Sequence, residues 1–255
     1  MPIASYTVRA STLAVAIATM VTIASPAQAQ SSPEDKADVD RSGTLTVTVT
    51  NLTHGTWFAP ILVAAHPAGF KAFTEGRPAS VALQSIAEIG DIAPLAESLP
   101  TAASIALNPA NGPLKPGGSA TAHLQRGKGT HNSRLSVLAM LVPTNDGFIG
   151  LNAIEIPTQP GYYTYTLSAY DAGTEANDEA RAAGPGIGQP GMGLPAFLNG
   201  VGIYSDAPGF ANARVEGYVH VHRGILGGAA GADSVLEQTM YRWMNPVARV
   251  TLTVR

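Results

Sequence analysis

Alternation of apolar and polar positions is the dominant pattern in this chain, and it predicts strands along most of its length. In residues 43–51, Leu45, Val47 and Val49 alternate with threonines, which is the period of two expected of a strand with one buried face. Residues 56–66 are more continuously apolar, so we expect both faces of that strand to be covered. Alternation or short apolar runs predict further strands at residues 119–125, 134–142, 148–156, 162–170, 215–223 and 248–255.

Residues 79–90 form the one convincing helical pattern after the N-terminal region. Ser80 is placed to cap the start of this helix and Gly90 to end it. Residues 184–195, rich in Gly and Pro, break all periodicity and predict a loop. About eight strands with one or two short helical inserts predict an all-β fold, an antiparallel β-sandwich. We find no repeat or linker after residue 43, so residues 43–255 are expected to form one domain.

The first 29 residues have the three-part plan of a secretory signal peptide. Arg9 is their only charge, residues 12–24 are apolar, and residues 27–29 form a small-x-small cleavage site. An apolar run of about 13 residues is shorter than the ~20 that a transmembrane helix needs. We therefore favour a cleaved signal peptide over a membrane anchor. Residues 30–42 are polar and predict a flexible lead-in.

Composition narrows the function classes. Without Arg9, residues 30–255 carry 14 Lys and Arg against 18 Asp and Glu, a net charge of −4, and no basic run. This balance argues against nucleic-acid binding and against docking on anionic lipid. The chain has no cysteine, so it forms no disulfide. Export without disulfides favours a secreted or periplasmic bacterial protein. No stretch after the signal peptide is long and apolar enough to predict a transmembrane segment.

Two acidic segments make the most specific chemical proposal. Asp146 lies in a turn after the strand predicted at residues 134–142, and Asp171 and Glu175 follow the strand predicted at 162–170. Carboxylates at loop positions are the ligands that Ca²⁺ prefers. The alternatives are ordinary turn chemistry for Asp146 and a helix N-cap for Asp171. Spacing alone leaves these alternatives open.

Two other groupings suggest different chemistry. His220 and His222 form an i, i+2 pair that could chelate zinc or copper, or could be the polar face of a strand. Asp146 and Asp171 could form the acid pair of a glycoside or ester hydrolase, although an aromatic content of 6% gives little sign of a sugar-binding platform. Residues 186–191 match G-x-G-x-x-G by letter, but they follow no strand and open no helix, so we do not interpret them as a phosphate cradle.

The order of residues in the acidic segments resembles the spondin N-terminal domain family. That family has an Asp before an aromatic-x-Gly stretch, as in residues 145–151, and later an Asp-Ala-Gly-Thr-Asp/Glu segment, as in residues 167–175. Residues 57–66, 73–89 and 247–254 also resemble its early core strand, its helix and its final strand. The resemblance implies a C2-like β-sandwich with one Ca²⁺, whose ligands fall on Asp146, Asp171 and Glu175. Glu175 stands where animal members usually carry Asp.

These observations predict an exported calcium-binding module rather than an enzyme. We expect a binding or adhesion role at the cell envelope, with an unidentified extracellular protein or glycan as partner. Asn177, Asp178 and Glu179 follow the second acidic segment closely. We expect them to be solvated rather than to support the metal site.

Overall fold

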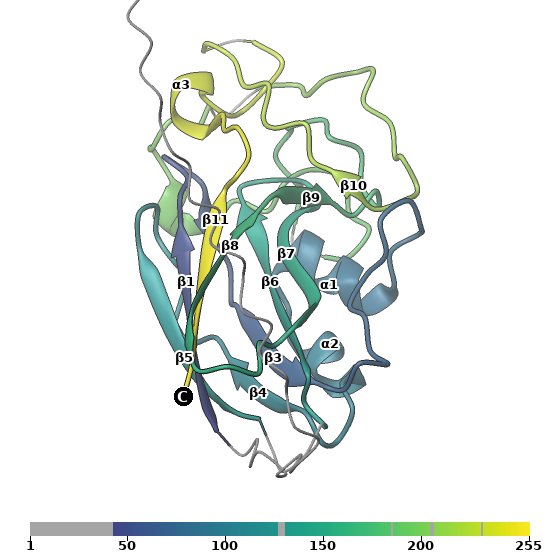
Figure 1. Cartoon of the computed structure of the whole chain (residues 1–255). Helices are drawn as coiled ribbons and strands as arrows, with labels where there is room; N and C mark the ends of the chain where they lie inside the picture. Colours follow the sequence, from purple (N-terminus) through teal and green to yellow (C-terminus); the bar gives the residue numbers. More distant parts are fainter. Residues whose placement is uncertain (1–42, 127–130, 185, 205–206, 231) are drawn as a thin grey trace, which may run out of the picture. The chain divides into compact units, whose positions relative to one another are not determined.

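The computed structural model describes residues 43–126, 131–184, 186–204, 207–230 and 232–255, and two antiparallel sheets form its framework (Figure 1). One sheet has four strands and the other has seven. The all-β sandwich predicted from the sequence is therefore confirmed. The predicted signal peptide and lead-in, residues 1–42, lie outside the described residues.

The smaller sheet consists of strands with one buried face. Its order is β5 (Ser119–Gln125), β1 (Thr44–Asn51), β11 (Ala248–Val254) and β8 (Gly161–Leu167). Val47 lies opposite Ala122 on one side and Leu252 on the other, and all three are buried. Their threonine neighbours point outward, where Thr48 and Thr121 are hydrogen bonded at 3.0 Å. The alternation seen in the sequence thus separates the core from the solvent.

The larger sheet supplies the strands that carry the acidic segments. Its order is β10 (His220–Val221), β9 (Ala169–Asp171), β7 (Gly147–Glu155), β6 (Arg134–Val142), β3 (Leu62–His66) and β4 (Ser104–Leu107), and β2 (Trp57–Phe58) pairs with β6. β10, β9 and β7 lie side by side at one edge. Asp171 is paired with His220 on one side and with Gly147, the residue after Asp146, on the other. Pairing of these strands therefore brings the two acidic segments and the histidines together.

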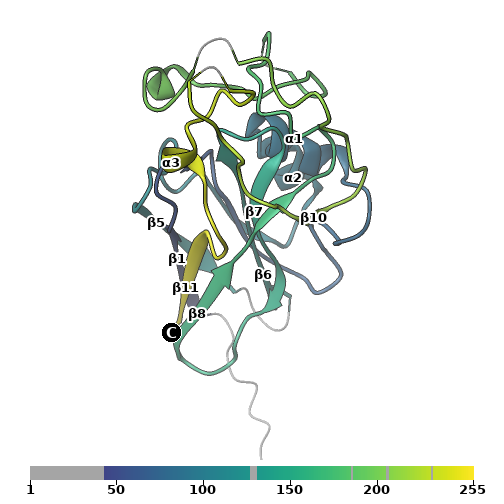
Figure 2. The ribbon, with the colours of Figure 1, turned by 90° about the horizontal axis from the view of Figure 1, so that it is seen from above.

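Both faces of the larger sheet are covered. One face packs on the smaller sheet, where Val63 and Val137 share a core with Val250. The other face packs on helices α1 (Val81–Ile89) and α2 (Ala93–Ser98), where Leu83 is buried with Phe148. Figure 2 shows these helices on the side of β6 and β7 away from β1 and β11. The expectation that both faces of the strand predicted at residues 56–66 are covered is confirmed for Leu62–His66.

Helix α1 begins and ends as its sequence predicts. The Ser80 hydroxyl accepts a hydrogen bond from the Leu83 amide at 3.2 Å, which caps the first turn. Gly90 ends the helix with φ +70°, a left-handed conformation that glycine adopts without steric cost. Helix α1 thus has defined ends, and Glu88 in its last turn accepts a hydrogen bond from the Gly188 amide, in the loop after β9.

Three of the predicted strands are wrong in extent. Residues 56–66 form two strands, β2 and β3, interrupted around Pro60, which has no amide hydrogen to donate to a ladder. Residues 162–170 divide at Ser168, where the chain leaves the smaller sheet and enters the larger one as β9. Residues 215–223 contain only the two-residue strand β10.

The described residues form eleven strands rather than about eight. Two predicted strands each divide into two, and β4 was not predicted from the sequence. Helix α2 was missed as well. The remaining short helical turns are η1 (Ala196–Leu198) and α3 (Gln238–Tyr241). Period-two alternation continues through a change of sheet, so it cannot mark where one strand becomes two.

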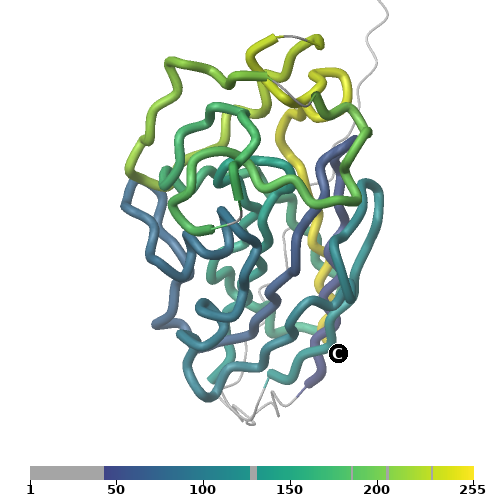
Figure 3. The backbone as a smooth tube through the Cα atoms, turned by 180° about the vertical axis from the view of Figure 1, so that it is seen from behind, coloured from purple at the N-terminus to yellow at the C-terminus, as the bar shows by residue number. Residues whose placement is uncertain are grey.

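Long loops between β9 and β11 gather at one end of the domain, green to yellow in Figure 3. Glu179, only 3% exposed, organises them. Its carboxylate accepts hydrogen bonds from the Leu226 amide at 2.7 Å, the Gly227 amide at 2.8 Å and the Ser234 hydroxyl at 2.5 Å. The expectation that Glu179 is merely solvated is wrong, because it is the shared acceptor that ties two distant loops together.

We expect Glu179→Ala to lower the free energy of unfolding by about 2–4 kcal/mol, because it leaves several buried donors without an acceptor. Urea unfolding in EDTA would measure this loss. Glu97→Ala is the control, since Glu97 is an exposed residue of α2 and should change stability by less than about 0.5 kcal/mol. Equal stability of the Glu179→Ala protein and the wild type would contradict this role.

Candidate metal site

A tight turn between β6 and β7 fixes Asp146, which is fully buried. The Thr144 hydroxyl accepts from the Gly147 amide at 3.0 Å and donates to the Leu141 carbonyl at 2.6 Å, which closes the turn. Asp146 Oδ2 accepts hydrogen bonds from the amides of Thr174 at 2.7 Å and Glu175 at 3.0 Å. Asp146 Oδ1 is buried and has no hydrogen-bond partner among the described residues. One oxygen of this carboxylate therefore binds the second acidic segment, and the other is available to a ligand.

Asp171 ends β9 and is also fully buried. Its Oδ1 accepts from the Gly173 amide at 2.8 Å, and its Oδ2 accepts from the Asn177 side-chain amide at 2.7 Å. Asn177 is only 5% exposed. The expectation that Asn177 is solvated is therefore wrong, because this side chain holds the carboxylate of Asp171 in place. Asp178, which is half-buried, accepts a hydrogen bond from the Asn145 side-chain amide at 2.9 Å.

Gly173 allows a second loop to lie directly on the Asp171 turn. Its φ is +67°, and a Cβ atom there would lie 2.3 Å from the Tyr218 carbonyl oxygen. The Gly217 amide donates to the Gly173 carbonyl at 2.8 Å, so the backbones are in contact. This close approach brings Glu216 over the turn, beside Asp171.

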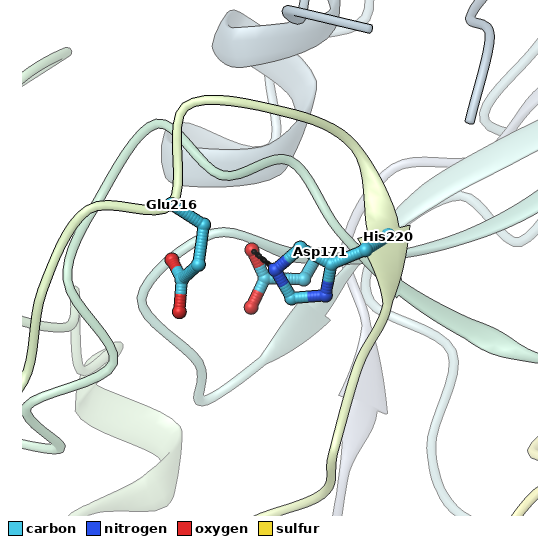
Figure 4. Close-up of side chains that lie close together, drawn as sticks. All are labelled: Asp171, Glu216 and His220. Carbon is cyan, nitrogen blue, oxygen red and sulfur yellow. Dashed lines mark ion pairs between the residues drawn. The ribbon is translucent and has the colours of Figure 1, made fainter. Parts of the chain in front are cut away.

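Asp171, Glu216 and His220 form a compact group of possible metal ligands (Figure 4). Each offers one ligand atom, and these atoms lie within 4.8 Å of one another. Glu216 Oε2 and His220 Nε2 are buried and have no hydrogen-bond partner among the described residues. Sequence reasoning missed Glu216, because it falls in a stretch expected to be strand and carries no motif. Its only signal was its position four residues before His220.

Hydrogen bonds to the ring nitrogens assign different roles to the two histidines. The Nδ1 atom of His220 lies 3.0 Å from the Val221 carbonyl oxygen, which can only accept, so Nδ1 carries the proton. In the neutral form of the ring, the lone pair of Nε2 is turned towards Asp171 Oδ1, 3.5 Å away. Two electron-rich atoms at this distance repel each other unless His220 is protonated or a cation lies between them.

His222 has the opposite arrangement. Its Nδ1 accepts from the Gly224 amide at 3.0 Å, so the ring proton is on Nε2, which lies 4.0 Å from Asp171 Oδ2. Burial lowers the pKa of His222 to about 3, so the ring is neutral at physiological pH. The structure brings both histidines to Asp171, but only His220 presents a bare nitrogen. His222 Nε2 has no hydrogen-bond partner among the described residues and, because it carries the ring proton, it does not complete a histidine chelate.

Burial disfavours the charged forms of Asp146 and Asp171 and raises the pKa of both. Burial raises the pKa of Asp146 to about 7, and the neighbouring charge of Asp171 adds to the rise, while the amides of Glu175 and Thr174 oppose it. Burial also raises the pKa of Asp171, against hydrogen bonding from Asn177 and the charge of His220. A bound cation would stabilise both carboxylates in their charged form.

Glu175, the third predicted calcium ligand, lies on the other side of Asp146. Its amide binds Asp146, and its side chain, 6% exposed, lines a cavity that also contains Glu88. Burial and then the charges of Glu88 and Asp146 raise the pKa of Glu175 to about 9. The group of atoms within 4.8 Å of one another contains Asp171 but neither Asp146 nor Glu175. Shared calcium ligation by Asp146, Asp171 and Glu175 stays a prediction.

The pKa of Glu175 predicts that the metal-free protein loses stability as the pH rises above 6.5. The folded state keeps a proton on Glu175 up to about pH 9, whereas the unfolded chain releases it near pH 4.5. Stability therefore falls with rising pH in this window, and Asp146 adds to the fall up to about pH 7. The buried histidines do not offset it, because above pH 6.5 they are largely neutral in both states.

We expect the melting temperature in EDTA to decrease between pH 6.5 and 9, and Glu175→Gln to flatten this decrease. Differential scanning calorimetry would measure both. Asp233→Asn is the control, because Asp233 is exposed and the variant should follow the wild-type profile. A melting temperature that rises with pH in this range would contradict the assignment.

The contact at Gly173 gives a separate test of how the site is assembled. We expect Gly173→Ala to destabilise the protein and to weaken metal binding, because the new methyl group would overlap the backbone of Tyr218. Gly117→Ala is a matched control, since Gly117 has φ +70° but nothing within 4 Å of a Cβ. Both variants carry the cost of left-handed backbone, so only the loss at Gly173 beyond that at Gly117 reports on the loop contact. Equal effects of the two substitutions on metal affinity would contradict this role of Gly173.

Comparison with known proteins assigns the chain to a family. The family model described as Spondin_N matches residues 49–180, about half of the 255 residues, and the match includes Asp146, Asp171 and Glu175. Glu216, His220 and His222 lie after the matched segment. No curated protein matches the chain. Within the described residues, no helix has the length and apolar character needed to cross a bilayer. Given the extent of the match, and a β-sandwich that agrees with the fold expected of the family, this chain belongs to the Spondin_N family.

Proposed function

We propose that this protein is an exported, extracellular binding module that holds one Ca²⁺ between the turn after β6 and the loop after β9. The observation that carries the proposal is Asp146, a fully buried carboxylate with one oxygen lacking any partner in the described structure and with Asp171 as its charged neighbour. Burying an unpaired charge costs several kcal/mol unless a cation or a proton neutralises it. Family membership supports the extracellular setting.

The chemistry of the ligands favours calcium at this position. Asp146, Asp171 and Glu175 offer carboxylate oxygens on loops, and Ca²⁺ takes six to eight oxygen ligands in flexible geometry. Asp146 already receives two amide hydrogen bonds from the second segment, so a cation on its other oxygen would join segments that are in contact without it. The expected gain is modest, about 1.4 kcal/mol at a Ca²⁺ concentration ten times the dissociation constant. Calcium would then order the loops rather than create the fold.

A binding role fits the acids better than catalysis does. The cavity that contains Glu175 and Glu88 is not lined by Asp146 or Asp171. A hydrolase that used Asp146 and Asp171 would need both at a cleft open to substrate, whereas both side chains are fully buried. We therefore propose that the protein recognises a protein or glycan at the cell envelope. The recognition surface would be the end of the sandwich where the long loops between β9 and β11 gather.

Calorimetric titration of the EDTA-treated protein with CaCl₂ tests calcium binding. We expect uptake of one Ca²⁺ and a higher melting temperature, and we expect Asp146→Asn and Asp171→Asn each to weaken binding at least tenfold. Asp233→Asn, at an exposed position, should bind as the wild type does. The proposal fails if the wild type releases no heat and shows no melting shift, or if both acid variants bind Ca²⁺ normally.

A second candidate is a transition-metal site that shares Asp171. It is favoured by the compact group of Asp171, Glu216 and His220 and by the bare Nε2 atom of His220. Mixed imidazole and carboxylate ligands suit Zn²⁺, which binds through nitrogen and oxygen at about 2.0–2.2 Å. In this alternative His222, whose Nε2 lies 4.0 Å from Asp171 Oδ2, would have to move closer to form a hydrogen bond that orients Asp171.

Separate substitutions distinguish the two metals. If the second candidate holds, His220→Ala and Glu216→Gln should each lower Zn²⁺ affinity at least tenfold and leave Ca²⁺ affinity within twofold of wild type. His123→Ala is the control, because His123 is exposed on β5. Calorimetric titration of each variant with Zn²⁺ and then with Ca²⁺ would measure both affinities. Zn²⁺ binding that survives both substitutions would exclude this candidate.

A further inference from the structure

A cavity of about 540 Å³ lies beneath the Gly-rich loop that follows the acidic segments. Its walls are mostly apolar and come from β6, from the residues before β3 and from residues 191–197 of that loop. Its apolar wall residues include Pro60, Met140, Val142, Met192, Leu194 and Phe197. A cavity of this size and character is within the range of small-molecule sites in proteins.

Two carboxylates, Glu88 and Glu175, also line this cavity. Each is only 6% exposed. Glu88 Oε1 accepts from the Gln84 side-chain amide at 2.8 Å, and its Oε2 accepts from the Gly188 amide at 2.5 Å. Among neighbouring charges, Glu88 acts most strongly on Glu175. The cavity therefore combines an apolar wall with two buried carboxyl groups, whose charged forms a bound cation would stabilise.

The Gly-rich loop is held in place as one wall of this cavity. The Ala182 amide donates to the Met192 carbonyl at 3.0 Å, and the Met192 amide donates to the Ala180 carbonyl at 2.7 Å. Gly191, with φ +94°, makes this pairing possible, because a Cβ atom there would lie 2.7 Å from the Ala182 nitrogen. The bond from Gly188 to Glu88 fastens the middle of the loop to helix α1. The loop thus encloses space rather than simply linking elements.

We propose that this cavity binds a small molecule with an apolar body and a terminal ammonium group placed between Glu88 and Glu175. Burial against the walls favours the apolar body, at roughly 25 cal/mol per Å². The two acids favour a cation with several hydrogen-bond donors and oppose an anion. Arg181 also lines the cavity, but its side chain is exposed, so the acids dominate the enclosed part. This site lies outside the group of Asp171, Glu216 and His220, but it shares Glu175 with the proposed calcium site.

Methionine methyl groups provide direct reporters of this cavity. With ¹³C-methyl methionine in the protein, hexylamine should shift the signals of Met140 and Met192 in a saturable way, and Met192→Leu assigns one of them. Met244, 87% exposed and outside the cavity lining, is the internal control and should not shift. We expect hexylamine to bind at least ten times more tightly than 1-hexanol, and hexanoate to give no saturable shift.

Glu88→Gln should weaken hexylamine binding at least tenfold, whereas Glu97→Gln, exposed on α2, should leave it unchanged. The titrations are run in EDTA and again in CaCl₂, and hexylamine binding in EDTA separates this site from metal binding. Unshifted Met140 and Met192 signals, or equal affinities for hexylamine and 1-hexanol, would overturn the proposal. The comparison of hexylamine, 1-hexanol and hexanoate uses the wild-type protein. It therefore tests the preference for an ammonium group even if Glu88→Gln does not fold.

Discussion

The end of the sandwich where the long loops gather depends on one interaction. The buried carboxylate of Asp146 accepts hydrogen bonds from the backbone amides of Thr174 and Glu175. It joins the turn between β6 and β7 to the segment after β9, and the adjacent strands β7 and β9 keep the two in register. Charge is essential to this bond, because a carboxylate is a stronger acceptor than a neutral group. The same charge is costly at a fully buried position, and this cost explains the raised pKa of Asp146.

The loops beyond β9 repeat this use of buried carboxylates. Asp171 holds the Gly173 turn and Asn177, Glu179 joins the loops around residues 226 and 234, and Glu88 fastens the Gly-rich loop to α1. In each case an acid satisfies backbone amides that irregular loops would otherwise bury without partners. Glu175 links the two proposed sites, since its amide binds Asp146 and its side chain lines the cavity. Without cysteines, the chain relies on these bonds to order its longest loops.

The sequence predicted what depends on local pattern and missed what depends on long-range contact. Helix α1 was predictable because Ser80 and Gly90 mark its ends, and β1 because its alternation reflects a single buried face. Asp146 and Asp171 were found because each lies at a strand end within a recognisable segment. Glu216 was missed, since only the backbone contact between Gly173 and residues 217–218 brings it to Asp171. Glu88 appeared to be an ordinary helical residue, and its role depends on a loop 100 positions away in the sequence.

The claim that a cation neutralises Asp146 is tested most directly by a crystal structure determined in calcium, with anomalous data to identify the ion. We expect one anomalous peak for a Ca²⁺ ion coordinated by Asp146 Oδ1 and by Asp171, with metal–oxygen distances of about 2.3–2.6 Å. We also expect Asp146 Oδ2 to keep its bonds to the Thr174 and Glu175 amides. A structure at saturating calcium in which Asp146 Oδ1 contacts only protein or water, with the ion elsewhere, would contradict the account.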